Sequence, residues 1–221
     1  MYTDKYWKRR AKKKAPLKKR AIFHLVFAGT LLSILITNYL FITLFSDLMA
    51  KITWFIALPL YMGLSYLGGT ILLKSKKPMV SFFGVTLIGL PLCSILHACS
   101  GGTLTIFIQQ VLLTTIISTV LLSIVQILTS TVSIPSWSIL AVALSSAVFF
   151  NILLIQELSE TPLMNWVIVL FIHARLGHVW NKVRETTASI DNAIDGVGIL
   201  LIESLSPVYY FEVAKKLSHK K

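Results

Sequence analysis

Three carboxylates lie within one short and otherwise largely apolar segment near the C-terminus of the chain. Asp191 and Asp195 are four residues apart and would share one face of a helix, and Glu203 follows eight residues after Asp195, again near that face. An ionisable side chain inside a membrane-spanning helix is costly, and it commonly marks an ion or proton path. The pattern therefore indicates a stripe of carboxylates that lines a cation or proton pathway.

The segment before this stripe supplies candidate counter-charges. They are Arg175, His173 and His178. A second interpretation exists for Asp191 and Asp195, because the helix dipole favours negative charge near a helix N-terminus and both could cap and flank the helix at the water interface. The sequence leaves both interpretations open for the two aspartates. Glu203 lies near the middle of the segment, and there the sequence favours a functional role.

Other chemistry has little support in the sequence. It contains no G-x-S-x-G, no H-E-x-x-H and no glycine-rich phosphate loop. Cys93 and His97 have the spacing of two ligands on one helix face, with Cys99 nearby, but two ligands do not make a metal site, and packing of a small thiol explains them. We therefore expect no catalytic activity, no metal and no cofactor.

Hydroxyl side chains recur at helical spacing in the centre of the chain. They include Thr114, Thr115, Ser118, Thr119 and Ser123. Inside a membrane such groups hydrogen-bond between helices or to their own backbone. We expect them to serve helix packing.

The composition decides the class of fold. Of 221 residues, 55% are hydrophobic and 14% are charged, whereas about a quarter are charged in a soluble domain. No Asp, Glu, Lys or Arg occurs between Pro78 and Gln156. The sequence therefore predicts an all-α, polytopic helical membrane protein with six or seven transmembrane helices.

The apolar runs define the candidate spans, since a helix needs about 20 apolar residues to cross the hydrocarbon core. They cover residues 21–45, 52–73, 79–98, 103–129, 138–155, 162–180 and 193–211. Together they form one bundle, 21–211, between basic tails at 1–20 and 212–221. The last run contains charged residues and Pro207, so it could be a seventh span, a re-entrant helix or an amphipathic segment.

Positive charge resists translocation, so the loops indicate an orientation. The N-terminal tail and the loops at 74–77 and 175–184 are basic, whereas the loops near Asp47, Gly101 and 157–160 carry no net positive charge. This alternation predicts a cytosolic N-terminus. The lysine-rich C-terminus favours an even number of spans and the hydropathy favours seven, so the number of spans stays open, as does the identity of the membrane.

The N-terminal tail is strongly basic, with ten Lys or Arg among its first 20 residues. Such charges contribute about 1 kcal/mol each near an acidic leaflet. The candidate docking residues for anionic lipid head groups or a partner are Lys8, Arg9, Arg10, Lys12, Lys13, Lys14, Lys18, Lys19 and Arg20. The main alternative is a pure topology signal. Nucleic acid is not favoured, because aromatic residues occur only at the start of the tail.

The layout resembles the Bax inhibitor-1 (TMBIM) family of six-plus-one-span membrane proteins over about residues 20–211, through its basic start, short loops and very apolar central spans. That family's last span carries a pattern like Ala-Leu-x-Leu-Tyr-x-Asp. Here Ala193–Ile199 has the small and aliphatic start without the Tyr or the Asp, and His173–Gly177 replaces the family's Asp-Thr-Gln-like turn. The resemblance implies a calcium leak gated by paired aspartates, for which Asp195 or Glu203 would have to substitute.

Two functions follow as expectations. The first is a small cation or proton leak channel, in which Glu203 faces a polar cavity. The second is a non-catalytic membrane subunit of a larger secretion, translocation or respiratory complex, whose partners are other membrane subunits docked on the basic tails.

Overall fold

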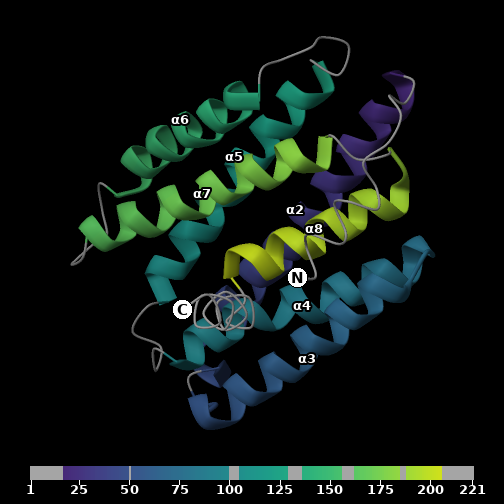
Figure 1. Cartoon of the computed structure of the whole chain (residues 1–221). Coiled ribbons are helices and arrows are strands. Elements are labelled where there is room, and N and C mark those ends of the chain that lie inside the picture. The colour runs from purple at the N-terminus through teal and green to yellow at the C-terminus, as the bar shows by residue number, and fades with distance from the viewer. Residues whose placement is uncertain are drawn as a thin grey trace, which may run out of the picture.

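The computed structural model describes residues 17–49, 51–99, 105–128, 136–155, 162–184 and 188–205. Every regular element within these residues is a helix. The helices are α2 (Leu17–Met49), α3 (Trp54–Lys74), α4 (Pro78–Cys99), α5 (Thr105–Leu128), α6 (Ser136–Ile155), α7 (Pro162–Arg184) and α8 (Ile190–Leu205) (Figure 1). The predicted all-α class is confirmed for the part of the chain that the structure describes.

Four of these helices contain stretches long and apolar enough to cross a membrane. The stretches are Lys19–Leu48, Trp54–Lys74, Pro78–Ile95 and Thr105–Leu128, and a shorter apolar stretch, Ser138–Phe150, lies within α6. The described part of α8 has 16 residues, a rise of about 24 Å. The fold is therefore compatible with a membrane protein, and the total of six or seven spans stays a prediction.

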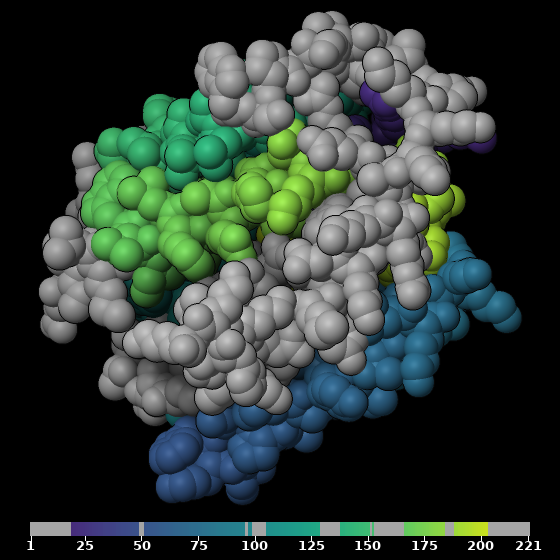
Figure 2. Space-filling view, viewed as in Figure 1, coloured from purple at the N-terminus to yellow at the C-terminus, as the bar shows by residue number. Residues whose placement is uncertain are grey.

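The helices are arranged around α8. In Figure 1, α3 and α4 lie on one side of α8, and α7 and α6 lie on the other. Contacts from α8 reach α2, α3, α4 and α7, while α6 packs on α5 and α7 at the periphery. Figure 2 shows α6 and α7 side by side on one flank and α3 on the opposite flank. Although α8 is the shortest helix in the described residues, it is an inner one.

Every residue of α8 from Asn192 to Leu201 is buried. Two glycines allow neighbouring helices to pack closely on two sides of α8, because a larger side chain at either position would collide with them. A Cβ at Gly196 would lie 2.9 Å from Cγ2 of Val183 on α7, and one at Gly198 would overlap Leu72 of α3. The described part of the predicted 193–211 segment is therefore enclosed by other helices, and its three alternatives, a seventh span, a re-entrant helix or an amphipathic segment, stay open.

The outermost helix is α3. It buries Tyr61, Ser65, Gly68 and Leu72, a stripe three or four residues apart. Its other faces expose large apolar side chains such as Phe55 and Ile56, 69% and 65% exposed. An apolar exterior of this kind is typical of a surface that meets lipid or another protein rather than water.

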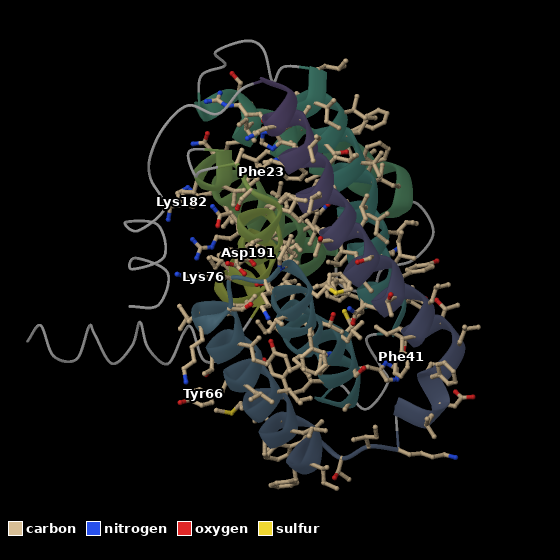
Figure 3. The ribbon with its side chains drawn as sticks, turned by 90° about the vertical axis from the view of Figure 1, so that its right-hand side faces the viewer. Phe23, Phe41, Tyr66, Lys76, Lys182 and Asp191 are labelled. Atoms are coloured by element: carbon tan, nitrogen blue, oxygen red, sulfur yellow. The ribbon has the colours of Figure 1, made fainter. Side chains whose placement is uncertain are left out.

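Basic residues collect at one end of the bundle. Near that end, Trp180 of α7 donates a hydrogen bond of 3.3 Å to Nδ1 of His24 on α2. Figure 3 shows Lys76 and Lys182 on the same side as Asp191, with Phe41 on the opposite side. The predicted cytosolic N-terminus stays a prediction.

Candidate functional site

The start of α8 is fixed by a side-chain cap. The backbone N–H of Asn192 donates to Oγ of Ser189 at 3.1 Å, and that of Ala193 donates to the carbonyl of Ser189, also at 3.1 Å. Ser189 is therefore an N-cap, and the helix begins at Ile190, earlier than the predicted 193. As a result Asp191 lies in the first helical turn, where the helix dipole favours its negative charge.

Asp191 also connects α8 to α4. It is half-buried, and its Oδ1 accepts a hydrogen bond of 2.7 Å from Oγ of Ser81. Ser81 is itself fully buried. Hydrogen bonds to charged groups are the stronger ones in proteins, so this pair is a specific link between the two helices. The capping role considered for Asp191 and this link are compatible with each other.

Asp195 lies one helical turn further into the bundle. Its side chain is 0% exposed, and it is the one Asp, Glu, Lys or Arg side chain that is buried among the described residues. A Cβ at the neighbouring Gly196 would lie 2.9 Å from Val183 of α7 and 3.3 Å from Phe27 of α2, so this part of α8 lies in the interior of the bundle. A buried carboxyl is costly unless it is neutral, paired or hydrogen-bonded. Asp195 is therefore an ionisable side chain enclosed by the packing of α8.

The other residues of the predicted pathway are Glu203 and the candidate counter-charges Arg175 and His178. Glu203 belongs to α8, two turns beyond Asp195, and its side chain lies outside the described residues. Arg175 is half-buried on α7 and His178 is exposed. The helix thus brings the three predicted carboxylates onto one element, and only two of their side chains are described.

His173 is directed to a different helix from the one expected. Its side chain is 0% exposed, with Nε2 3.0 Å from Oγ of Ser118 on α5 and Nδ1 2.7 Å from the carbonyl of Val169. Both ring nitrogens have these partners, so the contacts tie His173 to α5 and to its own helix rather than to a carboxylate of α8. The sequence did not single out the contact with Ser118, since these two residues are 55 positions apart.

The hydroxyl groups of α5 divide into two kinds, as expected. Thr115, Thr119 and Ser123 each donate to a carbonyl of their own helix at 2.7 Å. Ser118 instead pairs with α7. Its partner on another helix distinguishes Ser118 from Thr115, Thr119 and Ser123.

The Cys93 and His97 region is used for packing. Nε2 of His97 is 2.9 Å from the carbonyl of Ser46, just after a kink in α2 at Phe45, and Nδ1 is 3.2 Å from Oγ1 of Thr105. His97 therefore joins the ends of α2, α4 and α5. Within the described residues no three His, Cys, Asp or Glu side chains gather as metal ligands; the side chain of Cys99 is outside that set.

The predicted docking residues fall mostly outside the described part of the chain. This applies to Lys8, Arg9, Arg10, Lys12, Lys13 and Lys14, and to the side chain of Lys18. Lys19 is exposed and Arg20 is half-buried at the start of α2, at the basic end of the bundle.

Compared with protein-family models, with curated proteins and with solved structures, the chain matches none of them.

Proposed function

We propose that this chain is a multi-pass integral membrane protein that conducts protons or small cations, with Asp195 as the ion-binding group at its centre. The observation that carries the proposal is the complete burial of the Asp195 carboxyl on an inner helix. A carboxyl group at such a depth lowers stability without a compensating role, and in membrane proteins such groups commonly bind or transfer ions.

The position of Asp191 supports a route to Asp195. The two residues are one turn apart on α8, a rise of about 6 Å. Asp191 is half-buried near the basic end of the bundle and Asp195 is fully buried. A cation or proton entering at that end would meet the half-buried carboxylate first and the buried one next. Glu203, two further turns along the same helix, would continue the route.

The resemblance to the Bax inhibitor-1 family is part of the same proposal. That family is associated with a calcium leak gated by paired aspartates, and in this chain Asp195 would take over one of those roles. In the same proposal the N-terminus lies in the cytosol, and the basic tail with Lys19 and Arg20 binds anionic lipid head groups.

Ion flux in proteoliposomes tests the proposal. The purified chain is reconstituted with a trapped pH-sensitive or calcium-sensitive dye, and flux is compared for wild type, Asp195→Asn and Asp47→Asn. Asp47 is an exposed acid near the end of α2 and serves as the matched control for loss of one carboxylate. We expect Asp195→Asn to abolish flux and Asp47→Asn to preserve it. Wild-type protein that conducts neither ion would overturn the channel and leave the complex-subunit alternative, which co-purification of partner subunits would test.

A further inference from the structure

The turn between α3 and α4 is cationic and has an ordered backbone. Three exposed lysines belong to this lysine turn (residues 74–77), and they are Lys74, Lys76 and Lys77. The backbone N–H of Lys77 donates to Oγ of Ser75 at 3.0 Å. The carbonyl of Lys77 accepts the N–H groups of Val80 and Ser81, both at 3.0 Å, and so begins α4. The three lysines therefore extend from one short segment whose hydrogen bonds hold its shape.

Exposed apolar side chains follow directly on the lysine turn. Met79 and Phe83 of α4 are 87% and 56% exposed. Met79, Phe82 and Phe83 are three or four residues apart, so they lie along one outer face of the helix. On the other side of the turn, Leu73 is also exposed. The exterior thus changes from cationic to apolar between Lys77 and Met79.

Little acidic charge accompanies these lysines in the described part of the chain. The acidic side chains described are Asp47, the half-buried Asp191 and the fully buried Asp195. Asp47 lies at the other end of the bundle, because the carbonyl of its neighbour Ser46 is 2.9 Å from Nε2 of His97 near the end of α4. Asp191 is bound by the hydroxyl of Ser81. The described surface around the lysine turn therefore carries an excess of positive charge.

The length of α3 relates the lysine turn to the thickness of a bilayer. The 21 residues from Trp54 to Lys74 rise about 31 Å, close to the hydrocarbon thickness of about 30 Å. Trp54 is exposed at the opposite end of the helix, and tryptophan is enriched where hydrocarbon meets water. With α3 across a membrane, the lysine turn lies at the level of the lipid head groups and Met79 and Phe83 lie at the level of the acyl chains.

We propose that the lysine turn and the outer face of α4 bind an anionic phospholipid, with its phosphate at the lysines and an acyl chain along Met79 and Phe83. Charge complementarity accounts for the head group. The exposed apolar face decides between ligands: a free phosphate or a nucleic acid would use the lysines alone, whereas an amphiphile matches both surfaces. The site is separate from the basic tail. It rests on the membrane location in the proposed function and not on ion conduction.

Photo-cross-linking of the reconstituted full chain tests the proposal. The probes are phosphatidylglycerol and phosphatidylcholine that carry the same diazirine acyl chain, each added in trace amount to phosphatidylcholine vesicles. Mass spectrometry measures the yield at residues 79–83, expressed as the ratio of anionic to zwitterionic probe. In the test variant, glutamine replaces all three lysines of the turn, and in a second variant arginine replaces them. Lys51→Gln is the matched control, because Lys51 is exposed at the opposite end of α3. Size-exclusion chromatography checks that each variant is folded.

One lysine beside an anionic head group favours it about fivefold, so the wild-type ratio should be roughly five or more and fall to about one in the glutamine variant. The arginine variant and Lys51→Gln should keep the wild-type ratio, and so should wild type in millimolar inorganic phosphate at constant ionic strength. A wild type without preference for the anionic probe, or a folded glutamine variant that keeps it, would overturn the lipid site. Loss of the preference in phosphate would also overturn it, in favour of a free anion.

The two probes separate this site from the proposed function. Labelling of residues 79–83 by neither probe would contradict the membrane location itself, and with it both proposals. Labelling with the expected preference in a protein that conducts no ions would support the lipid site and leave only the channel overturned.

Discussion

The side-chain amide of Asn38 on α2 donates a hydrogen bond of 3.0 Å to the backbone carbonyl of Gly89 on α4. Its Oδ1 also accepts the backbone N–H of Cys93 at 3.4 Å. Gly89 and Cys93 are four residues apart, the spacing of a helical hydrogen bond, and Pro91, which has no N–H, lies between them. Asn38 therefore supports α4 at the position where its proline weakens the helix.

Replacing Asn38 by Leu should destabilise the protein. The substitution leaves two buried backbone groups of α4 without this side-chain partner, at a cost of about 1–3 kcal/mol. Thermal unfolding of the detergent-purified protein measures it. Ser33→Ala is the control, because Ser33 is exposed on the same helix and donates only to the carbonyl of Thr30. Equal Tm values for Asn38→Leu and Ser33→Ala would show that the link is dispensable.

Two glycines of α3 should respond in opposite ways to alanine. A Cβ at Gly68 would lie 2.5 Å from the backbone carbonyl oxygen of Gly84, whereas a Cβ at Gly63 has nothing within 4 Å. Gly68→Ala should therefore separate α3 from α4 and cost about 1–3 kcal/mol. Gly63→Ala should be neutral or stabilising, because alanine is the better helix former by about 0.5–1 kcal/mol. The Tm of each variant measures this. Equal shifts in Tm for Gly68→Ala and Gly63→Ala would contradict the prediction.

The helices could be predicted from the sequence because each is a long apolar run between turn residues or charges. For example, the run predicted at 79–98 corresponds to α4, Pro78–Cys99, which begins directly after the lysine-rich loop at 74–77. The start of α8 was predicted later than it occurs, since Ile190–Asn192 looks polar in sequence and its helical state depends on the cap by Ser189.

The tertiary partners could not be predicted, because they depend on which faces of the helices meet. The sequence identified Asp195 as a candidate, but its complete burial follows from the packing of α8 among α2, α4 and α7. The contact of His173 with Ser118 joins residues 55 positions apart, and no local motif signals it. Since both faces of a buried helix are apolar, periodicity gives little information about such contacts.

The link between Ser81 and Asp191 should contribute measurably to stability. Ser81→Ala removes a buried hydroxyl that donates to a carboxylate at 2.7 Å, and hydrogen bonds to charged groups contribute about 1.5–3 kcal/mol. Thr86→Ala is the control on the same helix, because Thr86 donates only to the carbonyl of Phe82. We expect a lower Tm for Ser81→Ala than for Thr86→Ala. If Asp191 also serves ion entry, Ser81→Ala should change flux in proteoliposomes while Thr86→Ala does not.

The two ends of α3 should lie on opposite sides of the membrane. Lys51, just before α3, and Lys76, just after it, are both exposed. In a background with Cys93→Ala and Cys99→Ala, which removes both cysteines of the chain, Lys51→Cys and Lys76→Cys each provide one thiol. A membrane-impermeant maleimide should label Lys51→Cys in intact cells and Lys76→Cys only after permeabilisation, because basic loops resist translocation.

The reverse labelling pattern would invert the proposed orientation and place the basic end outside. Labelling of both thiols in intact cells would show that α3 does not cross the membrane, in spite of its length of 21 residues and its apolar composition. Expression of each variant is checked by labelling after full denaturation. Ser75 is half-buried in the same turn as Lys76. In the same cysteine-free background, Ser75→Cys should be labelled from the same side as Lys76→Cys but more slowly, because the reagent has less access to it.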